Sequence, residues 1–374
     1  MKIKINGTYY VDFSDFSYEQ SLDSIASCFS FACRFDRENR ELFRPLTFPR
    51  VEFFEDNGTL FFTGIIIDHS FQSAATSNLV QMSGYSLPGV LEDCTVPYGG
   101  YSLENNNVSL QEIVRRLIKP FNLQLVVDSS VAEEASKNYA KSAAAPEDVI
   151  KDYIAKLASQ RNIILSHNEK GQIVLFRPNI HQKPVAVFTD QNTFEIKLEV
   201  SGQNIHSEIT NLRQPKAKKE KKKKKDAEVG EDSLGYPLDL KQPDTPENPK
   251  PPKAKKPKEK PVYQDTHKNP LVKAFRPIVK VLSEGEDFDT KQASKNQFAD
   301  ELKNIKISIG MKDWMDIKVG QIIQVVNEEI FIEKPANLII MSIGKSESEA
   351  GKEMSIEAVL PETFTGDSPK NIFA

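Results

Sequence analysis

Few residues of this sequence have the types and spacing that catalysis or metal binding requires. No histidine has a second histidine four residues away or a cysteine at zinc-ligand spacing. The five histidines are His69, His167, His181, His206 and His267. His167 stands beside Asn168 and is interpreted as a hairpin residue. No Gly-x-Ser-x-Gly sequence supplies a serine nucleophile.

Two further groups have only part of an active-site pattern. Gly344-Lys345-Ser346 matches the end of a phosphate-binding loop. Such a loop also needs a glycine five positions before Gly344, and that position is occupied by Ile339. Asp148 and Asp152 would share one face of a helix, where a solvated edge is a simpler explanation than an acid–base pair. We therefore predict no catalytic residue, no cofactor-binding residue and no metal ligand, and a protein that is not an enzyme.

The cysteines and the single tryptophan are predicted to be structural. Cys28, Cys33 and Cys94 fit neither a disulfide framework nor a metal site, so buried free thiols are expected. Cys28 and Cys33 are five residues apart in a strand-like run and should point to opposite faces. Trp314 is expected to anchor a core rather than to form a binding platform.

The length of 374 residues supports two or three domains with their own cores. No apolar run approaches the length of a membrane-spanning helix, so no stable membrane insertion is expected. The N-terminal residues lack the apolar centre of a signal peptide, which predicts synthesis and folding in a cytoplasm.

A basic, proline-rich stretch interrupts the chain. Eight of the ten residues from Lys216 to Lys225 are lysine, and residues 214–277 hold eleven of the 22 prolines. Between 214 and 270 there are 16 lysines, no arginine and 10 acidic residues. The whole chain has 49 basic and 53 acidic residues, so the rest of the chain has 33 basic and 43 acidic residues and is net acidic. We predict a solvated, disordered or extended insertion over 214–275, although its lysines could contact phosphate, an acidic protein or anionic lipid. The acidic remainder argues against tight nucleic-acid binding.

Deleting residues 214–262 should leave the fold intact, because closing a long loop costs little entropy. Thermal unfolding of the deletion variant checks this expectation. A large fall in the melting temperature would mean that the insertion is packed against the body.

The most distinct helix is predicted between Ser109 and Lys119. Ser109 and Glu112 have the spacing of a capping box, and Pro120 cannot continue the helix. Asn105 to Asn107 are interpreted as turn residues before it. A second helix is expected to have Pro146 at its first position. Strands at Leu123 to Val127, Ile163 to Leu165 and Ile173 to Phe176 complete an α+β module.

Short alternating segments on both sides of this module predict strands. Asn6-Gly7 and Asp56-Asn57-Gly58 are hairpin signals in the first part. In the last part, a helix from Asp289, with Gln292 at the third position, to about Lys303 is followed by strands. These strands are expected at 305–309, 319–326, 330–332, 338–343 and 354–360. The fold class is α+β and mostly β. The domains are expected at 1–95 (β-rich), 96–184 (α+β), and 185–213 with 276–374 (β-rich), with the insertion at 214–275.

The order of several segments resembles the baseplate hub proteins of contractile-tailed phages, the late control D family. The segments are Phe62 to Asp68, Gly84 to Ser86, Leu91 to Cys94, Tyr98 to Gly100, Ser109 to Ile113, Pro120 to Leu123, Val149 to Arg161, Gly171 to Leu175, Pro335 to Leu338 and Pro361-Glu362. None is a catalytic signature, and the lysine-rich insertion departs from the family pattern.

The resemblance implies a late structural protein of the virion tail baseplate, synthesised in the host cytoplasm. Each chain would contribute two similar barrel-like tube domains, with the α+β module at the periphery. Three chains would form a pseudo-sixfold ring that joins the hexameric tail tube to the central spike and lets DNA pass. The implied partners are two further copies, a tail tube or tube-initiator protein, the spike, other baseplate proteins and, transiently, DNA in the lumen. An acidic body suits a bore that does not retain DNA.

Three other functions remain open from the sequence. A hub or spike component of a contractile secretion machine has the same tube domains, although such chains usually continue into a β-helical spike, for which no repeats are found. A tail-associated cell-wall hydrolase would clear peptidoglycan in a zymogram. A nucleic-acid-binding module would act through Lys216 to Lys260 and would lose DNA retention when residues 214–262 are removed.

Overall fold

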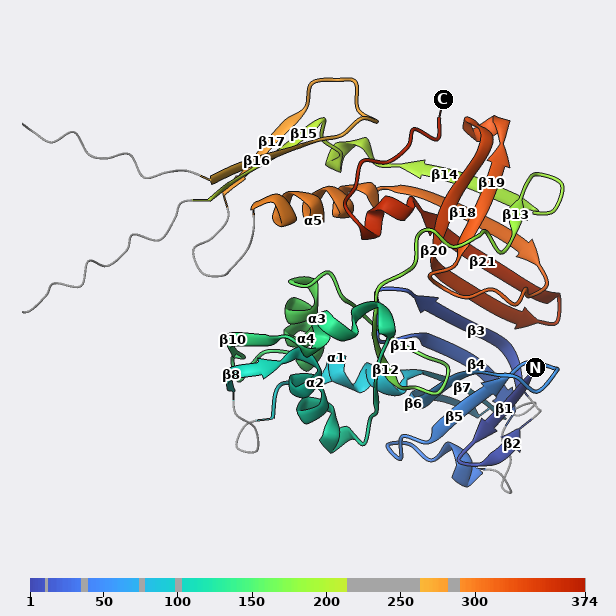
Figure 1. Ribbon diagram of the computed structural model, residues 1–374. Coiled ribbons are helices and arrows are strands. Elements are labelled where there is room, and N and C mark those ends of the chain that lie inside the picture. The colour runs from blue at the N-terminus through green and yellow to red at the C-terminus, as the bar shows by residue number, and fades with distance from the viewer. Residues whose placement is uncertain are drawn as a thin grey trace, which may run out of the picture.

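The computed structural model describes residues 1–10, 13–34, 40–73, 78–97, 103–213, 263–281 and 290–373. The fold is α+β and mostly β, as predicted (Figure 1). No helix within these ranges is long and apolar enough to cross a membrane. Two strand blocks lie one above the other, and a mixed module with most of the helices lies beside the first block.

The first block is built from seven strands. They are β1 (Lys2–Ile5), β2 (Thr8–Tyr10), β3 (Phe13–Ser21), β4 (Cys28–Arg34), β5 (Arg50–Phe54), β6 (Leu60–Ser73) and β7 (Asn78–Ser86). Both predicted hairpins are confirmed, because β1 pairs with β2 and β5 pairs with β6, both antiparallel. Alternate residues fill an aromatic core in which the rings of Phe29, Phe53 and Phe62 lie 5.0–5.3 Å apart. Cys33 lies in this core and Cys28 is exposed on the opposite face. The predicted opposite orientation is therefore confirmed, whereas the expected burial of Cys28 is wrong because its position in β4 faces outward.

The module between the blocks contains four helices and five strands. They are α1 (Val90–Asp93), β8 (Glu104–Ser109), α2 (Leu110–Ile118), β9 (Leu125–Val127), α3 (Ala132–Ser136), β10 (Asn138–Ala143), α4 (Ile150–Ser159), β11 (Ile164–His167) and β12 (Ile173–Phe176). The predicted cap of α2 is confirmed: the Ser109 hydroxyl accepts a hydrogen bond from the backbone N–H of Glu112. The predicted β11–β12 hairpin is also present.

Two expectations for the module are wrong. Asn105 to Asn107 are not turn residues, because they lie in β8 and pair with β10. Pro146 does not open a helix. The backbone N–H of Ala145 donates to the Asp148 carboxylate, and Val149 forms an extended bridge with Thr95, so α4 begins only at Ile150.

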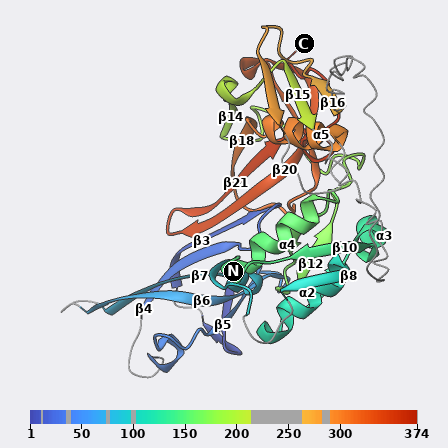
Figure 2. The same ribbon diagram turned by 90° about the vertical axis from the view of Figure 1, so that its left-hand side faces the viewer.

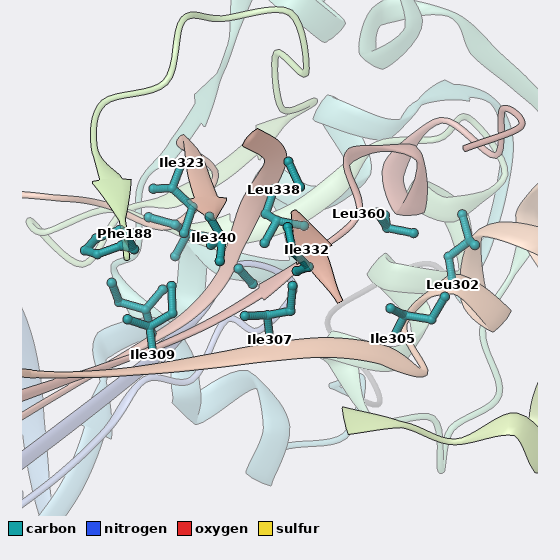
Figure 3. Packing of buried hydrophobic residues seen from close by; sticks show 14 of the residues in the cluster. Phe188, Leu302, Ile305, Ile307, Ile309, Ile323, Ile332, Leu338, Ile340 and Leu360 are labelled. Atoms are coloured by element: carbon teal, nitrogen blue, oxygen red, sulfur yellow. The ribbon is translucent and has the colours of Figure 1, made fainter. Parts of the chain in front are cut away.

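The second block contains nine strands and one long helix. They are β13 (Val187–Phe188), β14 (Glu195–Val200), β15 (Glu208–Arg213), β16 (Tyr263–Lys268), β17 (Pro277–Val281), α5 (Thr290–Leu302), β18 (Ile305–Lys312), β19 (Ile322–Asn327), β20 (Ile332–Ser348) and β21 (Gly351–Val359). Branched aliphatic side chains dominate its core, and Ile307, Ile309, Leu338 and Ile340 lie at its centre (Figure 3). Phe298 and Leu302 of α5 are buried in this core.

The second block corrects two further expectations. Residues 330–332 and 338–343 are not two strands. Ile330 ends a short 3-10 helix (Glu328–Ile330), and β20 runs without a break from Ile332, pairing first with β19 and then with β21 and β3. Residues 263–268 were assigned to a flexible insertion but form β16. The hydroxyl of Thr266 hydrogen-bonds that of Thr210 of β15, and the ring of His267 lies 4.4 Å from that of Phe298 of α5 in a tilted arrangement. This polar strand is therefore held by contacts that apolar alternation does not reveal. The rest of the insertion and the proposed cap at Asp289 lie outside the described residues.

The two blocks repeat one strand order. In space the first runs β3-β4-β7-β6-β5-β1 and the second runs β14-β18-β21-β20-β19-β13. The strands that correspond in space also come in the same order along the chain. The first four pairings are antiparallel in both blocks, whereas β1 pairs with β5 antiparallel and β13 pairs with β19 parallel. The chain therefore contains a structural repeat.

A single ladder joins the repeats into one sheet. Residues Ser342 to Glu347 of β20 pair antiparallel with Ser21 to Phe16 of β3. Figure 2 shows β20 and β21 continuing into β3 and β4. The resulting 13-stranded sheet crosses the boundary between the blocks.

Replacing Gly84 with alanine should destabilise the protein by about 3 kcal/mol, because an added methyl group would overlap the carbonyl oxygen of Ile65 across β6 and β7. Gly202→Ala is the matched control, since no atom lies within 4 Å of its added methyl group. Urea unfolding of both variants checks this. Equal stability of the two variants would contradict the close strand approach at Gly84.

Candidate functional site

One face of the continuous sheet is lined with small and polar side chains. Residues paired across neighbouring strands point to the same face, so a row of paired residues follows that face. One row crosses seven strands through Glu195, Gly310, Ser355, Gly344, Glu19, Cys28 and Tyr85. A second crosses seven strands through Lys312, Glu353, Ser346, Ser17, Ser30, Ser83 and Asp68. We call this face of the eight strands from β14 to β6 the polar face.

A shallow groove of about 590 Å³ lies on the polar face where the blocks meet. Its walls carry the acidic side chains of Glu19, Glu195 and Glu353 together with several serines. Among the described residues of the polar face, the acids are Glu19, Asp68, Glu195, Glu199, Glu353 and Glu357, and the bases are Arg34, Lys197, Lys306 and Lys312. This face is therefore weakly acidic and rich in hydroxyl groups.

The opposite side of the joint is held by a buried cation. The side chain of Lys345 is 7% exposed, and its Nζ lies 3.0 Å from Oε1 of Glu55 in the first block. The same nitrogen lies 4.9 Å from the ring centroid of Phe61 and 5.3 Å from that of Trp314. Such a cation is stabilised jointly by the carboxylate and by the faces of the aromatic rings. Because Lys345 lies within a strand, the Gly344-Lys345-Ser346 sequence has no phosphate-binding loop around it.

Trp314 anchors the joint, as expected. Its indole N–H lies 3.1 Å from the carbonyl oxygen of Ser346 and 3.0 Å from that of Glu353. Its ring lies 6.0 Å from those of Phe16 and Phe61 in the first block. Beside it, the hydrogen bond with Lys352 and a second one with the terminal amino group lower the pKa of Asp56 to about 2. Contacts of Trp314 and Asp56 therefore join sequence-distant parts of both blocks.

The module is attached to the first block through buried hydrogen bonds. Nδ1 of His167 lies 3.0 Å from the carbonyl oxygen of Asn168, and Nε2 lies 2.6 Å from Oγ of Ser27. A carbonyl only accepts, so Nδ1 carries the proton and Nε2 accepts from the serine hydroxyl. Thr63 of β6 donates to the carbonyl oxygen of Glu169 at 2.8 Å. His167 is thus the predicted hairpin residue, and it also connects two parts of the fold.

Lowering the pH should destabilise the protein through this histidine. Burial lowers the pKa of His167, while the neighbouring carbonyl of Asn168 and the charge of Glu169 oppose this in part. The unfolded chain therefore binds more protons than the folded chain as the pH falls below about 6.5, so the free energy of unfolding decreases there. Urea unfolding between pH 7.5 and 5.5 measures the slope.

The variant His167→Gln should have a flatter pH dependence over this range, whereas the exposed His181→Gln should keep the original slope. Burial also lowers the pKa values of His69 and His267, so some slope should remain in both variants. An unchanged slope in His167→Gln would show that this histidine does not couple folding to protonation.

The remaining sequence candidates have structural roles. The His206 ring lies 2.8 Å from Glu301 of α5, and Asp148 binds the backbone of Ala145. Asp152 lies at the exposed side of α4 beside Lys151. Within the described ranges, no group of three or more His, Cys, Asp or Glu side chains could hold a metal ion.

Neither β3 nor the joint was predicted from the sequence. The available signal was the alternation of Phe16 and Tyr18, which are buried, with Ser17 and Glu19, which are exposed. The segment from Ser14 to Ser21 was not assigned to a strand, so the partner of β20 could not be recognised.

Comparisons with known proteins agree with this geometry. The chain is similar in structure to the 43 kDa tail protein of prophage MuSo2 from Shewanella oneidensis, with a TM-score of 0.73, 16% identity, and coverage of 97% of this chain and 98% of that one. The tail protein from Neisseria meningitidis MC58 gives a TM-score of 0.71, 18% identity and 98% coverage of both chains. The chain therefore has the fold of these tail proteins.

The family comparison is more specific for the module. Residues 88–177 match the second domain of the gp44-like baseplate hub proteins, which confirms the resemblance to baseplate hub proteins. An Escherichia coli component of the type VI secretion system, described as structurally similar to the T4 tail proteins gp27 and gp5, has a TM-score of 0.53 at 8% identity, with coverage of 99% of this chain and 77% of that one. No curated protein sequence matches the chain.

Proposed function

We propose that this chain is the structural hub of a phage-tail baseplate. It assembles as a homotrimeric ring that joins a hexameric tail tube to a trimeric spike in the virion, and it acts without catalysis. The observation that supports this is the repeated strand order of the two blocks within one sheet. Three copies of a chain with two similar blocks present six similar units around one axis, which suits a sixfold partner on one side and a threefold partner on the other.

In this proposal each block is a tube domain. The domains are residues 1–95 and 185–213 with 263–281 and 290–373, and residues 96–184 form a peripheral module. The polar face lines the bore through which DNA passes. Its acids outnumber its bases, so it repels phosphate weakly and offers hydroxyl groups rather than a basic track. The tube or tube-initiator protein, the spike and other baseplate proteins would contact the rims of this ring.

The mass of the purified chain tests the proposal. Light scattering after size exclusion, at several concentrations, should give three times the chain mass, and negative-stain images should show rings with a central hole. A monomer at every concentration would remove the main support for a self-assembling hub and favour a chain that acts alone. Rings whose images show no threefold or sixfold features would contradict the adaptor role.

A hub of a contractile secretion machine is the second candidate, supported by the likeness to the type VI component over 99% of this chain. Electron microscopy of particles carrying a tagged copy separates the two. A label at the tip of DNA-filled phage particles supports the phage hub. A label on tubular assemblies that have no DNA-filled head supports the secretion machine.

A further inference from the structure

The repeat inside the chain predicts how one copy contacts the next. Within the chain, β20 of the second block pairs with β3 of the first block. By position in the repeat, β20 corresponds to β6, and β3 corresponds to β14. Among the described strands, β14 pairs only with β18, so its other edge has no partner strand. The edge of β6 that faces away from β7 pairs with β5 only as far as Ile65, and no described strand pairs with it beyond that residue. The two edges that correspond to the internal joint are thus at opposite ends of the eight-strand run from β14 to β6.

A shared irregularity fixes the alignment of β6 with β20. The pairing of β6 with β7 shifts register between Ile66 and Asp68, and the pairing of β20 with β21 shifts between Ile340 and Ser342. A bulge of one residue at the same place in both strands makes Asp68 equivalent to Ser342. Two and four residues further, Ser70 corresponds to Gly344 and Gln72 corresponds to Ser346.

The alignment of β14 with β3 follows from the neighbouring strands. Ser83 pairs with Ser30 in the first block, and its equivalent Glu357 pairs with Ser308 in the second. Ser30 pairs with Ser17, and Ser308 pairs with Lys197. Lys197 is therefore equivalent to Ser17, and Glu199 to Glu19.

We propose that β6 of one copy pairs antiparallel with β14 of a second copy, in the register of the internal β20–β3 joint. Gln72 then lies opposite Lys197 and Ser70 opposite Glu199 on the polar face, because Ser346 pairs with Ser17 and Gly344 with Glu19. On the other face, Phe71 lies opposite Leu198 and His69 opposite Val200. This inference rests on the proposed function, and it adds which edges meet and in which register.

The side chains at the two edges suit each other. Among the described residues no like charges stand opposite each other on the polar face, and a neutral partner faces both Lys197 and Glu199 of β14. On the other face, Phe71 is 43% exposed and Val200 is 51% exposed in the single chain. Because β6 and β14 lie on different surfaces of one chain, the contact is head-to-tail, which closes into a ring when the rotation between copies is suitable.

The hairpin between β19 and β20 supplies a second contact in this arrangement. It corresponds to the hairpin between β5 and β6, whose Glu55 and Asp56 contact Lys345 and Lys352 across the internal joint. At the corresponding tip Phe331 is 72% exposed and has a left-handed backbone, with φ of 63°. A bulky residue held in this conformation is strained and therefore unusual at an exposed tip. In the proposed joint this tip lies over β6 of the neighbouring copy, close to Phe71. An apolar contact between Phe331 and Phe71 thus takes the place of the ion pairs found at the internal joint.

Disulfide trapping tests the register. The full chain carries Cys28→Ser and Cys94→Ala, and Gln72→Cys is combined with Lys197→Cys. Mild oxidation should convert most of the protein to a species of three times the chain mass on a non-reducing gel, and a reducing agent should reverse this. Paired strand residues have Cα atoms about 4.5–5.5 Å apart, within the range of a disulfide.

Two control variants fix the interpretation. Ser17→Cys with Ser346→Cys occupies the equivalent internal pair and should form a cross-link within one chain, without a change of mass. Gln72→Cys with Ser201→Cys is shifted by four residues, about 13 Å along the strand, and should not cross-link.

The outcomes separate this inference from the proposed function. If light scattering shows a trimer but Gln72→Cys/Lys197→Cys does not cross-link, the proposed register is wrong, whether or not the shifted variant Gln72→Cys/Ser201→Cys cross-links. The proposed trimeric ring would still stand. A cross-linked ladder longer than three copies supports the edge pairing and contradicts closure at three. A monomer at every concentration with no cross-link in Gln72→Cys/Lys197→Cys contradicts both.

Discussion

Reversing three acidic charges of the polar groove should make the assembled protein retain DNA. Glu19, Glu195 and Glu353 line the groove where the blocks meet, and Glu→Lys at each changes the charge of each chain by six units. Lysines release counterions when they neutralise phosphate, so affinity should rise steeply at low salt. In a filter-binding assay we expect DNA retention at protein concentrations at least about 100-fold below those that the unaltered protein requires, with the gain falling as salt is raised.

The position of the charges is tested by moving them. A variant with Glu41→Lys, Glu133→Lys and Glu147→Lys has the same net charge, but these exposed residues lie away from the polar face. It should retain DNA only weakly at moderate salt. Equal retention by both variants would mean that net charge matters and the face does not. Strong retention by the unaltered protein would contradict a bore that lets DNA pass freely.

Replacing Trp314 with alanine should lower the free energy of unfolding by about 3 kcal/mol, near the lower end of what large aromatic deletions cost. The ring is half-buried between Phe16 and Phe61 of the first block, and its N–H satisfies two carbonyl groups of the second. Its removal takes the indole donor from those carbonyls and leaves the Lys345 ammonium without one of its aromatic faces. Urea unfolding measures the loss. It is followed by the fluorescence of an added dye, because Trp314 is the only tryptophan of the sequence and the variant has none.

Two substitutions calibrate the result. Trp314→Phe keeps an aromatic ring and loses only the donor, so about 1 kcal/mol is expected. Phe275→Ala removes an exposed ring from the same block and should change stability by less than about 0.5 kcal/mol. If Trp314→Ala were as mild as Phe275→Ala, the joint would depend on the β20–β3 ladder alone.

Local features were well predicted where one short segment contained the whole signal. The α2 cap depends on Ser109 and Glu112, and the first hairpin depends on Asn6-Gly7, so neighbouring residues were sufficient. The absence of a catalytic or metal constellation remains a prediction for the whole sequence.

The joint between the blocks could not be predicted because its determinants are far apart. Nothing near Lys345 in sequence indicates that Glu55 neutralises it or that Phe61 covers it. The strand β16 was missed for a related reason: its polar residues are ordered by β15 and α5, which are distant in sequence or separated by the insertion. The repeat of strand order was implied by the family resemblance but not by the residue patterns, since the blocks use aromatic residues in one core and branched aliphatic residues in the other.

The β20–β3 ladder also constrains the order in which a newly made chain folds. Ser21 pairs with Ser342, so more than 300 residues separate the partners. Contacts of such separation form late, and the first block leaves the ribosome long before β20 is synthesised. Until then β3 has an unpaired edge, which is prone to pair with other chains. A product truncated before β20 keeps that open edge and never completes the sheet, so it cannot offer a finished surface to other copies. The ladder therefore makes assembly depend on complete translation of the chain.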